Sequence, residues 1–476
     1  MATKTVLAVD LGAESGRVMG AAFDGTALIL KEINRFPNLP VLVRDTLHWN
    51  VLDLWRNITA GIEAGKTDRP ASMGVDAWGV DFALLDSQGN LISMPVHYRD
   101  RRTDGMMEKV FAKVPRQEVF LQTGIQIMQI NTLYQLASMV QAESPLLDIA
   151  DTFLTIPDLF NYWLSGEKVC EYTNATTTQM MDTASGGWAV ELLKRLDIPV
   201  GMLPDIVQPG TRLGAFDGIP VISPATHDTG SAVAAVPAAA SNFGYISSGT
   251  WSLAGIEVPS PVINREAAEA NVTNEGGVFG TIRLLKNVMG LWIVQQCRAT
   301  WHEQGFDYSY SELVDLARQA QPLVSLINPN DASLLSPGDH PECIRSLCRK
   351  SNQPIPEQPG EIIRTVLESL ALAYRDVFEE LEAISGQSID VLHIIGGGSQ
   401  NELLNQMTAD ATGKPVQAGP VEATVIGNAL MQLISLGELG SLDEGRQMVA
   451  KMTGTLRCDP HHSTEWKEAF ERYKQL

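Results

Sequence analysis

Residues 225–253 read ATHDTGSAVAAVPAAASNFGYISSGTWSL, and this stretch organises the chain. Its first part places the polar cluster His227-Asp228-Thr229 in front of an apolar, small-residue segment, Gly230 to Val236, which we expect to be helical. A linker over 237–242 follows. Asp228 is therefore a candidate catalytic carboxylate at a helix start, where backbone amides are expected to keep it ionised. The alternative is an ordinary N-terminal cap, which Asp commonly provides.

The second part of the stretch predicts a β-hairpin. The apolar runs Phe243 to Ser247 and Trp251 to Ile256 flank the turn Ser248-Gly249-Thr250. Small residues in such a turn let backbone amides approach a phosphate closely. A Gly-Thr turn between two strands is usually only a hairpin. This one gains meaning because a similar hairpin begins the chain.

The N-terminal hairpin consists of an apolar strand, Val6 to Asp10, a turn, Leu11 to Gly16, and a second strand, Arg17 to Phe23. Asp10 is a candidate to hold Mg²⁺ through water, since carboxylates suit this cation, although it also fits a role that only shapes the turn. Both hairpins begin halves of similar size that alternate strands and helices, which favours α/β layers. We predict domains at 1–236 and 237–476, with ATP in a cleft between the lobes.

Composition excludes several functions. The 476 residues are 44% hydrophobic and 19% charged, with a net charge of −21. Nucleic acids and anionic membranes both require a basic face, so we expect neither as a partner. No apolar run approaches the ~18 residues of a membrane span, and no leader is recognisable, so we expect a cytoplasmic protein. The five cysteines are sparse and odd in number, which favours free thiols.

The stretch 73–85, MGVDAWGVDFALL, predicts a strand, a turn at Trp78-Gly79 and a second strand. Asp76 and Asp81 flank the aromatic residue. Loops that combine aromatic and acidic side chains suit a sugar, because the ring packs on the aromatic face and the hydroxyls donate to the carboxylates. The alternative is a hairpin with exposed acids.

Two later segments carry further candidates. Residues 282–304 have helical spacing, which would place Asn287 and Gln295 on one face, although Gly290 weakens the helix. The strand Val391 to Ile395 is followed by Gly396-Gly397-Gly398 and a helix from about Asn401, a geometry typical of nucleotide binding. It lacks the third glycine of a dinucleotide fingerprint.

The ordered set of these motifs resembles the FGGY carbohydrate kinases over nearly the whole chain, most closely the members that act on L-rhamnulose. The motifs are VDLG-type residues at 9–17, GVDAWGVDFALLD at 74–86, YRDRRTDG at 98–105, EYTNATTTQ at 171–179, THDT at 226–229, YISSGTWSL at 245–253, LLKNVMGLW at 284–292 and GGGSQNELLNQMTADATG at 396–413. The resemblance implies two actin-like, ribonuclease-H-like domains with an ATP and sugar cleft. It also implies Mg²⁺-dependent transfer of the ATP γ-phosphoryl group to the 1-hydroxyl of L-rhamnulose, by a monomer or homodimer.

The resemblance assigns Asp228 as general base. Together with the loop residues named above, the sugar-binding candidates are Gly79, His227, Thr229, Asn287, Trp78 and Asp81. The ATP-binding candidates are Ala13, Glu14, Ser15, Gly16, Arg17, Thr250, Gln295, Gly397, Gly398 and Asn401. Glu14 departs from the small residues usual in the first phosphate turn, so its side chain must point away. Some related kinases carry cysteine pairs that this chain lacks, and we expect no disulfide.

Three alternatives remain open. The first is a kinase for another ketose, such as L-fuculose or L-xylulose, because one or two pocket residues separate these substrates. The second is an aspartic protease, since residues 228–231 spell Asp-Thr-Gly-Ser, but a second such motif is absent from the sequence. The third is a non-enzymatic ATP-driven scaffold of the actin or chaperone kind, which the same fold would permit.

Overall fold

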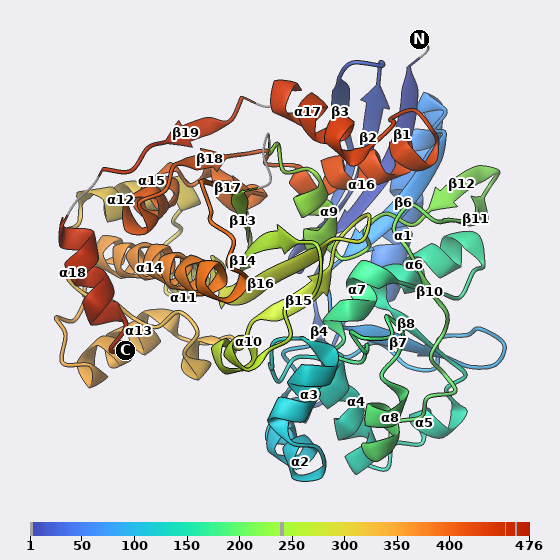
Figure 1. The fold of residues 1–476 in the computed structure, drawn as a ribbon, viewed down its shortest axis with the longest axis horizontal. Coiled ribbons are helices and arrows are strands. Elements are labelled where there is room, and N and C mark those ends of the chain that lie inside the picture. The colour runs from blue at the N-terminus through green and yellow to red at the C-terminus, as the bar shows by residue number, and fades with distance from the viewer. Residues whose placement is uncertain (1–2, 239–241, 453, 462–463) are drawn as a thin grey trace. The chain divides into compact units, whose positions relative to one another are not determined.

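The computed structural model describes residues 3–238, 242–452, 454–461 and 464–476. Chain contacts divide it into two compact units (Figure 1). Unit 1 comprises Met1–Ala239, Glu257–Leu284 and Ala423–Met452, and unit 2 comprises Ala240–Ile256, Leu285–Glu422 and Thr453–Leu476. Two segments from the second half of the chain thus group with the N-terminal half. The predicted linker at 237–242 includes residues 239–241, which lie outside the described residues.

Unit 1 is a mixed α/β unit. Its strands are β1 (Lys4–Leu11), β2 (Ser15–Phe23), β3 (Leu28–Pro37), β4 (Val41–Val43), β5 (Thr46–His48), β6 (Ser72–Ala77), β7 (Phe82–Leu85), β8 (Thr152–Thr155), β9 (Cys170–Glu171), β10 (Ile206–Val207), β11 (Arg212–Phe216), β12 (Ile219–Ile222) and β15 (Thr273–Gly276). Its helices are α1 (Val51–Gly65), α2 (Met106–Lys113), α3 (Arg116–Thr123), α4 (Thr132–Gln141), α5 (Leu146–Ile149), α6 (Ile156–Ser165), α7 (Tyr172–Thr177), α8 (Val190–Arg195), α9 (Asp228–Ala234), α10 (Arg265–Ala270), α16 (Ala423–Ser435) and α17 (Leu442–Met452). Short 3₁₀ turns lie at Lys66–Asp68 and Arg101–Thr103.

The main sheet of unit 1 has the strand order β11-β12-β6-β1-β2-β3. Leu7 and Ala8 are neighbours on β1, so their side chains point to opposite faces of the sheet. Leu7 packs under Gly65 at the end of α1, whereas Ala8 clusters with Met19 and with Val425 of α16. Helices α1 and α16 therefore cover opposite faces, which gives the predicted α/β layering.

Unit 2 surrounds the second sheet. Its remaining elements are β13 (Phe243–Ser248), β14 (Trp251–Val258), α11 (Trp292–Glu303), α12 (Tyr310–Gln319), α13 (His340–Lys350), α14 (Pro359–Ser385), β16 (Ile282–Met289), β17 (Val391–Ile395), α15 (Glu402–Thr412), β18 (Val416–Ala418), β19 (Leu456–Cys458) and α18 (Thr464–Tyr473), with 3₁₀ turns at Ala332–Leu334 and Gly397–Gln400. The sheet has the order β15-β16-β14-β13-β17-β18-β19, and the unit boundaries fall within β14 and β16. The apolar residues over 363–381 recur with a helical period, which predicts a helix, and α14 confirms it.

Two predictions about secondary structure are wrong. Residues 282–304 are not one helix: β16 ends at Met289 and α11 begins at Trp292. Gly290 permits this break, since a Cβ there would lie 2.8 Å from the backbone nitrogen of Ser252. Residues 182–209 contain only the short helix α8 rather than a long one. The C-terminal tail, expected to be helical, also contributes the edge strand β19.

No helix in the described part of the chain is both long and apolar enough to cross a bilayer. All five cysteines, each within the described ranges, carry free thiols.

Candidate functional site

The first candidate phosphate turn lies between β1 and β2, whose antiparallel register pairs Asp10 with Arg17 and Leu11 with Gly16. The turn is closed by the Gly12 amide, which donates to the Ser15 carbonyl at 2.9 Å. Asn38 braces it from outside: its side chain donates to the Gly12 carbonyl at 2.9 Å and its backbone amide to the Glu14 carbonyl at 2.8 Å. The predicted hairpin is confirmed as a structure, and its role in binding ATP stays a prediction.

Asp10 is buried at the base of this turn. Its Oδ2 accepts two hydrogen bonds from Arg17, from Nε at 2.9 Å and from Nη2 at 2.6 Å. The described residues contain no cluster of three or more His, Cys, Asp or Glu side chains that would hold a metal by themselves. Mg²⁺ is often held by only one or two carboxylates together with substrate phosphates. Asp10 therefore fits a water-mediated or single-carboxylate contact to Mg²⁺, and not a complete protein cage.

The second turn is in unit 2, between β13 and β14, whose register pairs Ser248 with Ser252. The amides at the start of α11 donate to it, Leu291 to the Gly249 carbonyl and Trp292 to the Thr250 carbonyl, both at 3.1 Å. Gln295 Nε2 donates to Thr250 Oγ1 at 3.4 Å. The structure thus brings together Thr250 and Gln295, two of the ATP-binding candidates.

The triple-glycine loop after β17 meets the same turn. Gly396 has φ of +83°, in the region that favours glycine. A Cβ on Gly398 would lie 2.0 Å from Ser248 Oγ, whereas one on Gly397 would meet nothing within 4 Å. Gly398 therefore allows close packing inside unit 2, and Gly397 faces open space. Asn401 caps α15, because its Oδ1 accepts from the Leu404 amide at 3.0 Å.

These two glycines give a matched pair of variants. Gly397→Ala should leave the thermal midpoint of unfolding unchanged and weaken ATP binding, if the loop contacts phosphates. Gly398→Ala should lower stability by about 1–3 kcal/mol, because its methyl group overpacks Ser248. Differential scanning calorimetry and nucleotide titration measure the two effects. Undiminished ATP affinity in Gly397→Ala would remove this loop from the nucleotide site.

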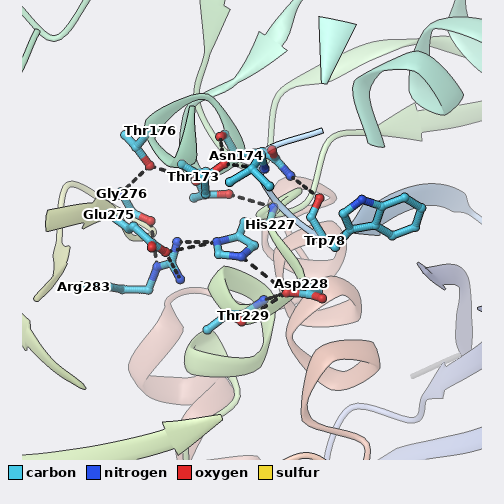
Figure 2. Close-up of polar contacts among 12 residues, drawn as sticks. Trp78, Thr173, Asn174, Thr176, His227, Asp228, Thr229, Glu275, Gly276 and Arg283 are labelled. Carbon is cyan, nitrogen blue, oxygen red and sulfur yellow. Dashed lines mark hydrogen bonds and ion pairs between the residues drawn. The ribbon is translucent and has the colours of Figure 1, made fainter. Parts of the chain in front are cut away.

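The candidate base, Asp228, is the first residue of α9, directly after His227 (Figure 2). Its Oδ1 accepts from the amide and, at 3.1 Å, from the hydroxyl of Thr229. His227 Nε2 lies 3.5 Å from the same oxygen. Among the described residues, none donates a hydrogen bond to Oδ2. The side chain is 27% exposed, so this second oxygen is available to accept a proton from a bound hydroxyl.

Burial raises the pKa of Asp228, and the neighbouring His227 and the hydrogen bonds from Thr229 oppose that rise. Burial is the largest influence, and the charge of Asp10 adds to it. The expectation that helix amides keep Asp228 ionised stays a prediction. A carboxylate with a raised pKa is a stronger base, which suits proton acceptance from an alcohol.

The polar loop at 171–179 forms the short buried helix α7, which positions the Asp228 segment. Glu171 Oε2 accepts from the Thr226 amide at 2.8 Å and from its hydroxyl at 2.9 Å. Thr173 Oγ1 accepts from the His227 amide at 3.1 Å. Asn174 Nδ2 bridges the carbonyls of Trp78, at 3.3 Å, and Thr226, at 3.4 Å. The loop therefore ties the candidate sugar loop to the candidate base, a role that sequence reasoning missed.

The segment around Trp78 is not a hairpin with exposed acids. Strand β6 pairs with β1 and β12, whereas β7 pairs with β8 in a separate sheet. Asp76 and Asp81 are both buried, at 0% and 1% exposed. Residue 79 must be glycine because a larger side chain would not fit: a Cβ there would lie 2.9 Å from Thr177 Oγ1. The chain thus turns between two sheets, and this turn presents Trp78 and Gly79 beside α7.

Asp81 is saturated with hydrogen bonds. Its Oδ2 accepts from the indole nitrogens of Trp49, at 2.5 Å, and Trp78, at 3.1 Å, and from the Tyr98 amide at 3.2 Å. Its Oδ1 accepts from Gln135 Nε2 at 2.9 Å. Trp49 also stacks on His97, with ring centroids 4.1 Å apart. Asp81 therefore orients this aromatic cluster, and a direct contact with a sugar, as predicted, would have to displace one of these donors.

The buried carboxyl of Asp81 predicts a pH effect on stability. Burial raises its pKa from 3.8 to about 6, against the hydrogen bonds from Trp49, Gln135 and Trp78. A raised folded-state pKa means that the folded protein binds the proton more tightly than the unfolded chain. Its stabilising contribution is therefore full below pH 3.8 and is lost as pH rises through about 6. The loss amounts to about 3 kcal/mol.

The measurement compares the thermal midpoints of unfolding of the wild-type protein and of Asp81→Asn between pH 4 and pH 7. The asparagine at residue 81 cannot titrate. The advantage of the wild-type chain should shrink as pH rises. Asp86→Asn is the control: backbone and side-chain hydrogen bonds lower the pKa of Asp86 from 3.8, so its contribution is lost only at more acidic pH and should stay nearly constant across this range. A constant difference for Asp81→Asn would mean that its four donors offset burial.

Each unit carries its own set of candidate residues. Unit 1 brings together Trp78, Gly79, His227, Asp228 and Thr229 around α7 and α9, and holds the turn Ala13, Glu14, Ser15, Gly16 and Arg17 with Asp10. Unit 2 brings together Thr250, Gln295, Gly397 and Gly398. Asn287 lies on strand β16 of unit 2, and not on a helix with Gln295 as predicted.

The two turns and the carboxylate at a helix start define the class of an α/β phosphotransferase, and comparison with known proteins agrees. Residues 5–233 match the N-terminal domain, and residues 244–436 the C-terminal domain, of the FGGY family of carbohydrate kinases. The chain belongs to this family, and is thus an enzyme of the carbohydrate kinase class with ATP as phosphoryl donor.

Similar proteins cover the chain almost completely. It is 45% identical over 482 residues to the rhamnulokinase of Bacteroides thetaiotaomicron, and the alignment covers 98% of each chain. It is 43% identical over 485 residues to the rhamnulokinase of Pectobacterium atrosepticum, covering 100% of this chain and 97% of the relative. Among solved structures, gluconate kinase from Lactobacillus acidophilus superposes with a TM-score of 0.81 at 16% identity, covering 100% and 97% of the two chains. Xylulose kinase from the same organism gives 0.80 at 15% identity, covering 99% and 97%. These structures confirm the two-domain actin-like fold.

Proposed function

We propose that this chain transfers the γ-phosphoryl group of ATP to the 1-hydroxyl of L-rhamnulose. The observation that carries the proposal is Asp228, whose Oδ1 is held by Thr229 and faces His227, while Oδ2 accepts no hydrogen bond from the described residues. The rhamnulokinases that match at 38–45% identity over nearly the full chain support the choice of sugar. The assignment of a sugar-binding domain at 1–236 and a nucleotide-binding domain at 237–476 is part of the same proposal.

In this mechanism Asp228 Oδ2 accepts the proton of the sugar hydroxyl as its oxygen attacks the γ-phosphorus in line with the leaving ADP. The backbone amides of the turns at 13–17 and 248–250 would bind the phosphates and stabilise charge in the transition state. Gln295, held beside Thr250, and the loop at Gly397 would complete the nucleotide contacts. Mg²⁺, when bound with ATP, would neutralise phosphate charge, and Asp10 is the residue that would hold it.

On the sugar side, Trp78 and Gly79 lie on the turn that Asn174 ties to the Asp228 segment. His227 and Thr229 flank the base. We assign these residues to sugar binding, with Asp81 and Trp49 orienting the turn. Asn287, on β16, stays a predicted sugar contact. A monomeric or homodimeric state and a cytoplasmic location stay predictions.

A panel of ketoses tests the choice of substrate. L-rhamnulose, L-fuculose, L-xylulose and D-xylulose are supplied with ATP, and ADP release is followed by a coupled assay. The proposal predicts that kcat/KM is highest for L-rhamnulose. A higher value for L-fuculose or L-xylulose would assign a different ketose. ATP turnover that ignores every sugar would favour the ATP-driven scaffold. The aspartic protease alternative has no support, since the chain belongs to a kinase family.

A further inference from the structure

A chain of buried charged residues runs behind His227 on the side opposite Asp228 (Figure 2). It consists of Glu275 at the end of β15 and Arg283 on β16, both in unit 1 with His227. Arg283 is 0% exposed, Glu275 4% and His227 6%. A fully buried guanidinium is expensive unless it is paired and hydrogen-bonded. The contacts of Arg283 therefore show which groups offset the cost of burying its charge.

Arg283 makes three contacts that fix its plane. Its Nε donates to the Gly276 carbonyl at 2.9 Å, and its Nη1 lies 3.2 Å from Glu275 Oε2. Its Nη2 lies 3.0 Å from His227 Nδ1. Arginine stays protonated in proteins and carries only donors, so the hydrogen bond to the imidazole requires a lone pair on Nδ1.

Glu275 has the opposite effect on the protonation of His227 Nδ1. Its Oε2 lies 3.2 Å from His227 Nδ1 and would favour a proton there. The same oxygen is paired with Arg283 Nη1, so the guanidinium neutralises the carboxylate while its other nitrogen donates to the ring. The hydrogen bond from Arg283 Nη2, at 3.0 Å, is the shorter of the two contacts, so Nδ1 is the acceptor and carries no proton.

When Nδ1 is bare, the proton of the neutral ring is on Nε2, the atom that faces Asp228 Oδ1 at 3.5 Å. This distance is at the outer limit of a hydrogen bond, and such contacts often tighten only when substrate is bound. The ring itself is held in place by its backbone, since the His227 amide donates to Thr173 Oγ1.

We propose that Arg283, paired with Glu275, is a positioning residue that holds His227 as an Nε2–H donor toward Asp228 Oδ1. This keeps Oδ2 of the base directed to the acceptor hydroxyl. The inference deepens the proposed function and rests on it for its catalytic consequence. Its structural content, the tautomer of His227, is independent of which sugar the enzyme takes.

The test reads the tautomer directly in the ligand-free protein. Long-range ¹H–¹⁵N spectra of protein labelled in histidine distinguish a protonated from a bare ring nitrogen, and the signal lost in His227→Gln assigns the residue. The expected result at neutral pH is a bare Nδ1 and a protonated Nε2. A protonated Nδ1, or protonation of both nitrogens, in the wild-type protein would overturn the proposal.

Variants test the cause. In Arg283→Met, Nδ1 loses its donor and the contact between Arg283 and Glu275 is removed, so Glu275 should draw a proton to Nδ1, while kcat falls about 10²-fold with KM for ATP within about twofold. Glu275→Gln keeps the arginine and should leave Nδ1 bare. Arg364→Met is the matched control, because Arg364 is a partly buried arginine that pairs with the buried Glu368 and has no contact with His227. It should change neither the His227 spectrum nor kcat beyond its effect on stability.

If Arg283→Met does not fold, Arg283→Lys provides the second variant. A lysine has one ammonium group and cannot serve both Glu275 and His227 in the geometry of the guanidinium fork. It should raise the protonated fraction of Nδ1 and lower kcat in the same direction. An Arg283 variant that folds and retains both the wild-type tautomer and the wild-type kcat would refute the positioning role. If the ketose assay fails while the tautomer is as expected, the proposed substrate is wrong and the inference about His227 stands.

Discussion

Asp228→Asn should fold and bind ATP normally, and its turnover should fall by about 10²–10⁴-fold. The amide cannot take the proton that Oδ2 accepts in the proposed reaction. The hydrogen bonds from Thr229 to Oδ1 can persist, so α9 should still begin at residue 228. Initial-rate measurements with saturating ketose and ATP give kcat, and nucleotide titration gives the affinity.

Asp53→Asn is the control for a purely structural effect. Asp53 is also an acid in the first turn of a helix, α1 of the same unit. Its loss should cost only about 0.3–1 kcal/mol of helix stabilisation and leave turnover unchanged. Near-normal turnover in Asp228→Asn would reduce Asp228 to the same capping role and end the base assignment.

Of the variants in unit 1 discussed above, Gly427→Ala should lower the stability of the protein most. Helix α16 crosses α9 at this residue, and a Cβ would lie 1.7 Å from the carbonyl oxygen of Ser231. The clash is with backbone, so a helix must move. Overpacking of this kind costs about 1–3 kcal/mol and occasionally more. Because α9 carries Asp228 at its start, kcat should fall together with the thermal midpoint.

Gly201→Ala is the matched control, since a Cβ at Gly201 meets nothing within 4 Å. It should leave both the midpoint and kcat unchanged. A Gly427→Ala protein with the stability and turnover of the wild type would contradict the tight crossing of α9 and α16 and the link between this crossing and the base.

The sequence predicts the elements that have strong local signals. The hairpins at Asp10–Arg17 and at Ser248–Ser252 were expected from apolar runs around small-residue turns, and α14 from its helical period. The error at 282–304 has a physical reason. Strand β16 is buried along most of its length, so it lacks the alternation that separates a strand from a helix.

The candidate site was only partly accessible from sequence. His227, Asp228 and Thr229 stand together in the chain, so a local motif reveals them. Glu275 and Arg283 are far from them in sequence, and only the pairing of β15 and β16 brings them to His227. One signal was available: Arg283 stands between the apolar residues Ile282 and Leu284, and a charge inside a buried strand implies a partner. Trp49 and Glu171 carry no such signal.

The central claim is that the chain makes a sugar phosphate ester and that Asp228 accepts the proton. ³¹P NMR of a reaction containing ATP, Mg²⁺ and L-rhamnulose measures this directly. The account predicts a new phosphomonoester signal coupled to the C1 protons, formed by the wild-type chain and almost absent with Asp228→Asn. Release of inorganic phosphate without an ester, or an ester formed at equal rates by both proteins, would contradict it.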